Sequence, residues 1–157
     1  MPAAELALID DIRAASRQMV RELGFMESTL AATDYPPSAV HTILEIGGRG
    51  PMTSAQLAEI LHLEKSSVSR MVRKLVDCGE LKEASDVDDA RIKPLSLTPK
   101  GRRTLAALHD FGRRQVAGAL ARLTPIERKT VREGLMIYAE ALRAGRDAET
   151  ELAEPMI

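Results

Sequence analysis

Residues 51–101 read PMTSAQLAEILHLEKSSVSRMVRKLVDCGELKEASDVDDARIKPLSLTPKG, and this stretch decides the fold of the chain. The pattern predicts two short helices joined by a tight turn, followed by a β-hairpin with a charged tip. Thr53-Ser54-Ala55-Gln56 fits a capping box, in which Thr53 caps the first helix and the Gln56 side chain bonds back to the Thr53 backbone. His62-Leu63-Glu64 leave room only for a turn. We therefore predict a helix-turn-helix that starts at Thr53.

The second predicted helix has two different faces. Its apolar residues recur at the i, i+3, i+4 and i+7 spacing of one buried face: Val68, Met71, Val72 and Leu75. The other side chains are basic or carry hydroxyls: Lys65, Ser66, Ser67, Ser69, Arg70, Arg73 and Lys74. Arginine can bridge a guanine edge, lysine can neutralise a phosphate, and short hydroxyls permit close approach. A run of cations is also common on a solvated helix face, but the capped helix before it and the hairpin after it favour contact with DNA.

A hairpin is predicted after Gly79, which is expected to end the second helix. Residues 80–84 and 93–97 are candidate strands, with Leu95 and Leu97 alternating inward. The sequence therefore predicts a winged helix-turn-helix, a mainly α fold that becomes α+β by virtue of the wing.

The tip of this wing, residues 85–92, is polar and acidic. We expect Arg91 to enter a minor groove of DNA and Asp89 to hold its guanidinium in place, because a carboxylate would be repelled by phosphate. A calcium loop is disfavoured, because the acidic cluster lacks the glycine and the distal glutamate of an EF-hand. The predicted contacts with double-stranded DNA are Thr53, Lys65, Ser66, Ser67, Ser69, Arg70, Arg73, Lys74, Asp89, Arg91 and Lys93.

These motifs resemble the MarR family of bacterial transcriptional regulators over residues 5–144. The matching stretches are Leu57-Ala58, Ser66-Ser67-Val68-Ser69-Arg70, and Asp89-Ala90-Arg91 followed by Leu97-Thr98-Pro99-Lys100-Gly101. The wing of the family often has two adjacent arginines after the aspartate, and here Ala90 takes the first place. Arg91 and Lys93 remain, so we expect the wing to bind DNA still, with lower affinity. The resemblance implies a winged-helix regulator, most simply a repressor.

Composition bounds the kind of protein. The chain has 157 residues, which suits a single domain over 1–157, and 45% of them are hydrophobic but only 3% aromatic. This favours a helical core of aliphatic side chains. The net charge of −1 means that affinity for DNA has to come from a local basic patch. We see no signal peptide and no apolar run of membrane-spanning length, and we expect a cytoplasmic, nucleoid-associated protein.

Helices are predicted on both sides of the winged lobe, which we place at residues 36–98. A first helix runs from Ala3 to Leu30, and a second from Pro37 to Ile46, where Gly47-Gly48 end it. Thr98-Pro99 opens a third helix, and Thr124-Pro125-Ile126-Glu127 is a capping box for a final helix that ends at Gly145. Residues 145–157 are then expected to be a frayed tail.

The flanking segments, 3–31 and 99–144, have more apolar surface than a winged helix of this size needs. They can close the core of the monomer, or they can interleave between two subunits. The second arrangement has the better physical motive, because a two-fold dimer presents two recognition helices to half-sites about 34 Å apart. The family resemblance implies the same. We predict a homodimer built from these helices.

The resemblance also implies a small anionic or phenolic effector, bound where the dimerisation helices meet the lobe. The candidate lining residues, each of which also suits an ordinary core, are Phe25, Met26, Tyr35, His41 and Phe111. His41 and His109 lie on helices expected to approach one another, but two histidines without a third ligand argue only weakly for zinc. We predict no metal and no cofactor.

Cys78 is the single cysteine of the chain, which excludes an intramolecular disulfide and fits a reducing compartment. Asp77 beside it disfavours the thiolate, so we expect a buried or half-buried spacer. The sequence has no nucleophile elbow, phosphate-cradling glycine loop or His-Glu-x-x-His motif, and we predict no catalytic residue. Two alternatives stay open: a DNA-binding module of a longer acetyltransferase-type protein, and a winged helix that binds proteins.

Overall fold

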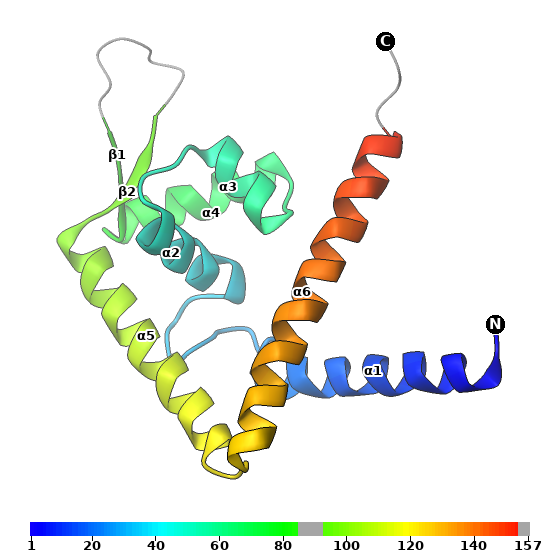
Figure 1. Cartoon of the computed structure of the whole chain (residues 1–157). Coiled ribbons are helices and arrows are strands. Elements are labelled where there is room, and N and C mark those ends of the chain that lie inside the picture. The colour runs from blue at the N-terminus through cyan, green and yellow to red at the C-terminus, as the bar shows by residue number, and fades with distance from the viewer. Residues whose placement is uncertain (85–92, 154–157) are drawn as a thin grey trace. The chain divides into compact units, whose positions relative to one another are not determined.

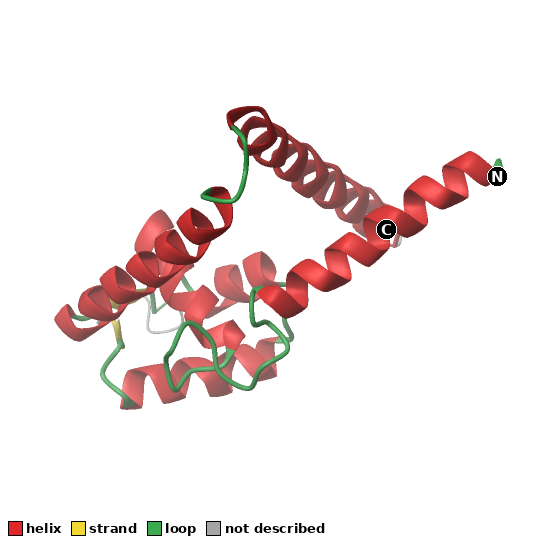
Figure 2. Ribbon diagram, turned by 90° about the horizontal axis from the view of Figure 1, so that it is seen from below, coloured by secondary structure: helices red, strands yellow, loops and turns green. Residues whose placement is uncertain are grey.

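The computed structural model describes residues 1–84 and 93–153 and is mainly helical, as predicted (Figure 1). In chain order its elements are α1 (Ala3–Glu22), α2 (Pro37–Arg49), α3 (Ser54–Leu61), α4 (Lys65–Asp77), β1 (Leu81–Glu83), β2 (Leu95–Leu97), α5 (Pro99–Leu120) and α6 (Pro125–Ala153). Within this described part the strands form one antiparallel pair, and helices supply the other regular structure (Figure 2). The order α3, α4, β1, β2 confirms the predicted winged helix-turn-helix.

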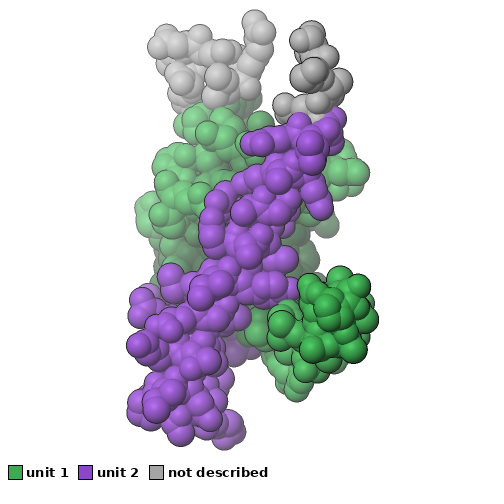
Figure 3. Space-filling view, turned by 45° about the vertical axis from the view of Figure 1, so that its right-hand side comes forward, with its two compact units in different colours: residues 1–112 green, residues 113–157 purple. Residues whose placement is uncertain are grey.

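The chain divides into two compact units, Met1–Gly112 and Arg113–Ile157, with the boundary inside α5 (Figure 3). The first unit contains the whole winged helix-turn-helix. The second consists of the end of α5 and the long helix α6, which buries none of its described residues. None of the described helices is both long and apolar enough to span a membrane. The division into a DNA-binding lobe and dimerisation helices stays a prediction, because it depends on a second chain.

The core of the first unit lies where α2, α3, α4 and the hairpin meet. Its most deeply buried apolar side chains are aliphatic, as the composition led us to expect: Val40, Ile43, Leu57, Val68, Leu75, Leu81 and Leu95. The inner face of α4 therefore packs against α2, α3 and the hairpin. The outer face of α4 is left to solvent.

The hairpin confirms the predicted alternation. In the hairpin Leu81 pairs with Leu97 and Glu83 pairs with Leu95. Leu95 and Leu97 are buried, whereas Ser96 between them is half-buried. The strand β2 also bridges to Met52, with backbone N···O distances of 2.7 and 3.1 Å in the two directions. Because Met52 directly precedes the cap of α3, this bridge ties the base of the wing to the helix-turn-helix.

The predicted end of the first helix at Leu30 is wrong, because α1 stops at Glu22. Gly24 takes the left-handed conformation (φ +84°) and closes a Schellman motif. In this motif the Gly24 N–H donates to the Arg21 carbonyl (3.0 Å) and the Phe25 N–H to the Val20 carbonyl (3.1 Å). A seam of apolar residues continued past Gly24 in the sequence, but the residues beyond it belong to a loop.

Two helices run through glycines that we expected to end them. The helix α2 passes Gly47 and Gly48 to reach Arg49, and α6 passes Gly145 to reach Ala153. A glycine inside a helix costs only about 1 kcal/mol relative to alanine, which neighbouring interactions can offset. In α6 an ion pair between Arg143 and Asp147 (2.7 Å) spans Gly145. The predicted frayed tail is therefore wrong for residues 145–153, which are helical.

Other predicted helix boundaries are confirmed. The box before α6 forms as expected, with the Thr124 N–H donating to Glu127 (2.9 Å) and the Glu127 N–H donating to the Thr124 hydroxyl (3.2 Å). Gly79 ends α4 in a second Schellman motif at φ +79°. The capping box was thus a reliable guide to its boundary, whereas glycine was a reliable stop at Gly79 but not at Gly47, Gly48 or Gly145.

Candidate nucleic-acid interface

The start and the end of α3 are fixed by a capping box and a tight turn, respectively. The Thr53 N–H donates to the Gln56 side chain (2.9 Å), and the Gln56 N–H donates to the Thr53 hydroxyl (3.2 Å), which confirms the predicted box. The helix α3 ends at Leu61 and is capped by His62, which is left-handed (φ 54°), and the Leu63 N–H donates to the Ala58 carbonyl (3.1 Å). The chain thereby turns within three residues and starts α4 at Lys65.

The two faces of α4 are as predicted. Val68, Val72 and Leu75 are buried, and Met71 is half-buried beside them. Of the predicted DNA-contact residues on this helix, Ser67 is half-buried. The other six are exposed: Lys65, Ser66, Ser69, Arg70, Arg73 and Lys74. The residues from Lys65 to Lys74 include no acidic side chain, so this exposed face is uniformly cationic. It can attract a polyanion and still bring short hydroxyls close to it.

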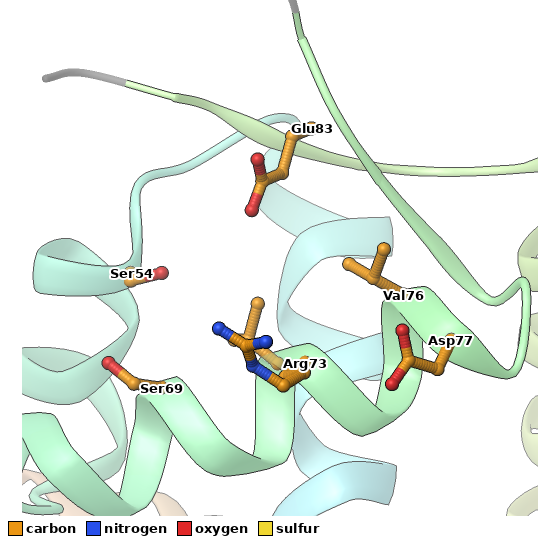
Figure 4. Close-up of a pocket in the computed structure, with 7 residues that line it drawn as sticks. Ser54, Ser69, Arg73, Val76, Asp77 and Glu83 are labelled. Atoms are coloured by element: carbon orange, nitrogen blue, oxygen red, sulfur yellow. The ribbon is translucent and has the colours of Figure 1, made fainter. Parts of the chain in front are cut away.

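A polar groove of about 440 Å³ runs along one edge of α4 (Figure 4). It lies between α4, the start of α3 and the strand β1. Figure 4 shows Arg73 in this groove with Asp77 and Glu83 around it. The full lining is Ser54, Ser69, Val72, Arg73, Val76, Asp77 and Glu83. The two carboxylates bring negative charge to this edge of the cationic face, beside Arg73. We did not predict either carboxylate as part of the interface.

A second groove, of about 280 Å³, lies along the other edge of α4 and is more apolar. Its lining combines the chain around Tyr35 and the start of α2 with five predicted core or contact positions of α4. The residues are Tyr35, Pro36, Ser38, Ala39, Ser67, Arg70, Met71, Lys74 and Leu75. The recognition helix is thus flanked on both edges by recessed surface.

The wing is described only at its base. Lys93, which precedes β2, forms an exposed ion pair with Glu83 of β1 (3.6 Å), and an exposed pair of this kind contributes at most about 1 kcal/mol. Asp89 and Arg91 fall within residues 85–92, outside the described part of the chain, so their predicted contact stays a prediction.

The predicted effector residues are only partly brought together. The rings of Phe25 and His41 stack in a tilted contact, with centroids 5.6 Å apart. Met26 is 74% exposed, and Phe111 is half-buried on α5. The Tyr35 hydroxyl instead donates to the buried carboxylate of Glu80 (2.9 Å). In residues 1–84 and 93–153 no three metal-ligating side chains cluster, whether around His41 or elsewhere.

Burial raises the pKa of Tyr35 above its ordinary value near 10, and the hydrogen bond and charge of Glu80 raise it further. The phenol therefore stays protonated and remains a donor to Glu80. Sequence reasoning missed Glu80, because a glutamate at the start of a strand carries no local sign of burial. Our expectation for Cys78 was wrong, because its side chain is exposed at the end of α4, where the chain leaves the core.

Comparison with known proteins places these features among regulators. A MarR family model matches residues 33–92. The HTH-type transcriptional regulator YfiV of Bacillus subtilis (strain 168) is 24% identical over 109 residues, which are 69% of this chain and 68% of that protein. A probable transcriptional regulator from Pseudomonas aeruginosa is 26% identical, with a TM-score of 0.66 over 83% of this chain and 98% of the other. Streptococcus pneumoniae FabT, solved in complex with DNA, is 22% identical, with a TM-score of 0.72 over 88% and 98%; this last likeness is one of fold.

Proposed function

We propose that this chain, whose residues 33–92 match a MarR family model, is a member of that family and a sequence-specific DNA-binding transcriptional regulator that acts as a homodimer on a pseudo-palindromic operator. The observation that carries the proposal is the outer face of α4, which is exposed, cationic and free of acids from Lys65 to Lys74. The proposed activity is binding, without a catalytic step. A regulator of this kind acts where the chromosome lies, so we propose a cytoplasmic, nucleoid-associated protein.

We assign different tasks to the side chains of this face. Arg70 lies near the middle of α4 and is the best placed to read a base edge, because arginine can bond bidentately to guanine. Lys74, one turn later, is proposed to contact a phosphate. The other proposed contacts support these two: Thr53, Lys65, Ser66, Ser67, Ser69 and Arg73, with Asp89, Arg91 and Lys93 from the wing.

The proposed partner in the dimer is a second copy of this chain. The described part of α1 has no buried residue, and its exposed apolar side chains include Leu8, Ile12 and Met19. On α6 four exposed apolar residues recur at spacings of four, three and four: Val131, Leu135, Tyr138 and Leu142. Such a seam is the pattern by which one helix packs against another. Two copies would cover these surfaces and pair two recognition helices for a palindrome.

We further propose that the protein is a repressor released by a small anionic or phenolic effector. The support is the match to the MarR family model together with the ring contact between Phe25 and His41. The predicted lining residues are Phe25, Met26, Tyr35, His41 and Phe111. A ligand that changes the separation of the two recognition helices would weaken binding at both half-sites at once.

The experiment that tests this proposal is a binding selection from genomic fragments with the purified protein at about 150 mM salt. Recovery of one short palindrome is the expected result. The double variant Arg70→Ala/Lys74→Ala should lose that preference, whereas the matched control Arg103→Ala removes a charge from α5 and should keep it. Recovery of no preferred site with the wild-type protein would overturn the proposal. A monomer mass that does not change with protein concentration would overturn the dimer.

A further inference from the structure

Glu80 is the one acidic side chain that the described part of the structure buries. It links the end of α4 to β1, and only 1% of the residue is exposed. One carboxylate oxygen accepts the hydrogen bond from Tyr35 and lies 3.9 Å from the Lys100 ammonium. The other oxygen is buried without a hydrogen-bond partner in the described chain. Burying a half-satisfied carboxylate costs free energy, and well-packed apolar side chains often replace buried charged groups without loss of stability, so stability alone does not explain its presence.

The backbone of Glu80 joins three elements. Its N–H donates to the Leu75 carbonyl (2.9 Å), which closes the last turn of α4. Its carbonyl accepts from the Thr98 N–H (3.1 Å), at the point where α5 begins. The Thr98 hydroxyl also donates to the neighbouring Gly79 carbonyl. The position of Glu80 therefore sets how the recognition helix, the wing and α5 meet.

The side chain of Glu80 extends this junction toward the predicted DNA-contact residues. Two hydrogen bonds fix the backbone of Tyr35. Its N–H donates to the Thr33 hydroxyl (3.1 Å), and its carbonyl accepts from the Leu30 N–H (2.9 Å). Its hydroxyl is held by Glu80, and its ring lines the groove along the edge of α4 that carries Ser67, Arg70 and Lys74. Tyr35 is thus held in place beside the edge of α4 that is proposed to read bases.

Lys100 completes the arrangement from α5. Its ammonium donates to the Cys78 carbonyl (2.7 Å), which belongs to the residue that caps α4. A cation at a helix C-terminus is favourable, because it neutralises carbonyls that have no partner within the helix. The same ammonium faces Glu80, so one lysine secures both the end of the recognition helix and the buried carboxylate.

We propose that Glu80 is a positioning residue for operator recognition, which acts through Tyr35 and Lys100 to fix the recognition helix against its neighbours. The inference rests on the proposed function. Contacts with base edges require the helix to be placed to within about 0.5 Å, whereas contacts with phosphates tolerate looser placement. Loosening this junction should therefore lower the affinity for the operator and leave the affinity for unrelated DNA unchanged.

The test compares Kd for the selected operator with Kd for a scrambled duplex of the same length. We expect Glu80→Met and Tyr35→Phe each to lower the ratio of specific to non-specific affinity about tenfold, the effect of one poorly read base pair. Glu80→Gln keeps an acceptor for Tyr35 and should retain part of the ratio. The control Glu59→Gln makes the same charge change on the exposed surface of α3 and should leave the ratio intact.

A purely structural role would give a different result, in which the melting temperature falls and both affinities change in parallel. We expect instead that Glu80→Met, assayed at a temperature where it is fully folded, keeps the wild-type affinity for the scrambled duplex and the wild-type salt dependence of binding. A wild-type ratio in either Glu80→Met or Tyr35→Phe would overturn the inference, because the two side chains are proposed to act together. Failure of the wild-type protein to prefer any site would instead overturn the proposed function, and this inference with it.

Discussion

Gly101 is the position where a single added methyl group should do the most damage. A Cβ on this residue would approach the Glu80 carbonyl oxygen closer than 3.0 Å, and the Leu97 Cβ to 3.3 Å. The oxygen belongs to the backbone and accepts a hydrogen bond from the Thr98 N–H (3.1 Å), so it has little freedom to move. Overpacking a core typically costs about 1–3 kcal/mol. Alanine recovers at most about 1 kcal/mol of helix propensity.

We therefore expect Gly101→Ala to lower the free energy of unfolding by about 2 kcal/mol, since its clash is with rigid backbone. That loss should lower the melting temperature by about 4–8 °C for a chain of this size. Two glycines of α2 provide matched controls for the same substitution. A Cβ on Gly47 would meet the Leu105 side chain, which can rotate away, whereas a Cβ on Gly48 would meet nothing within 4 Å.

The expected order of stability is Gly48→Ala, at or above the wild type, then Gly47→Ala, then Gly101→Ala. Thermal and urea unfolding, followed by circular dichroism at one fixed protein concentration, measure it. The concentration is fixed because dimerisation would add to the apparent stability. If Gly101→Ala unfolds at the wild-type midpoint, or if Gly48→Ala is equally destabilised, the close approach of α5 to the end of α4 is not as described.

Three further outcomes are expected. Thr53→Ala should lower the free energy of unfolding by about 1 kcal/mol, because the cap of α3 is lost; chemical denaturation measures it, and an unchanged midpoint would contradict it. Arg70→Ala should weaken operator binding by about 1–3 kcal/mol and relax specificity at one base position. Lys74→Ala should weaken binding to all DNA sequences alike and reduce the slope of log affinity against log salt by about 1. Equal effects of the two variants on specificity and on the salt slope would refute the different roles assigned to these side chains. Because the pKa of Tyr35 is raised in the folded state, its contribution to stability is complete below pH 10 and declines above it. Above pH 10 the free energy of unfolding should therefore fall less steeply with pH in Tyr35→Phe than in the wild type. Identical curves of unfolding free energy against pH would argue against the buried bond to Glu80.

Much of the fold was predictable because it depends on neighbours in the sequence. The capping boxes at Thr53 and Thr124, the Gly79 stop and the two faces of α4 all involve residues within about ten positions of one another. Side chains at such spacing meet whatever the rest of the chain does. For the same reason the sequence identified the exposed basic edge that carries the proposed function.

Glycine shows where local reasoning fails. Gly24 ends α1, but Gly47, Gly48 and Gly145 lie inside helices that continue past them. The sequence offers the same residue type in each case. The outcome depends on whether the surrounding contacts outweigh about 1 kcal/mol of propensity, and those contacts come from other turns of the helix and from other elements.

By itself, then, the sequence determined the order of elements, the recognition helix and its cationic face, because these follow from periodicity and capping. The tertiary structure alone decided that Glu80 is buried, that Tyr35 is its donor, and that Gly101 must lack a side chain. Tyr35 and Glu80 are 45 positions apart, and Lys100 reaches back 22 positions to Cys78. No short-range pattern encodes such contacts, because they exist only once the hydrophobic core has brought α4, the wing and α5 together.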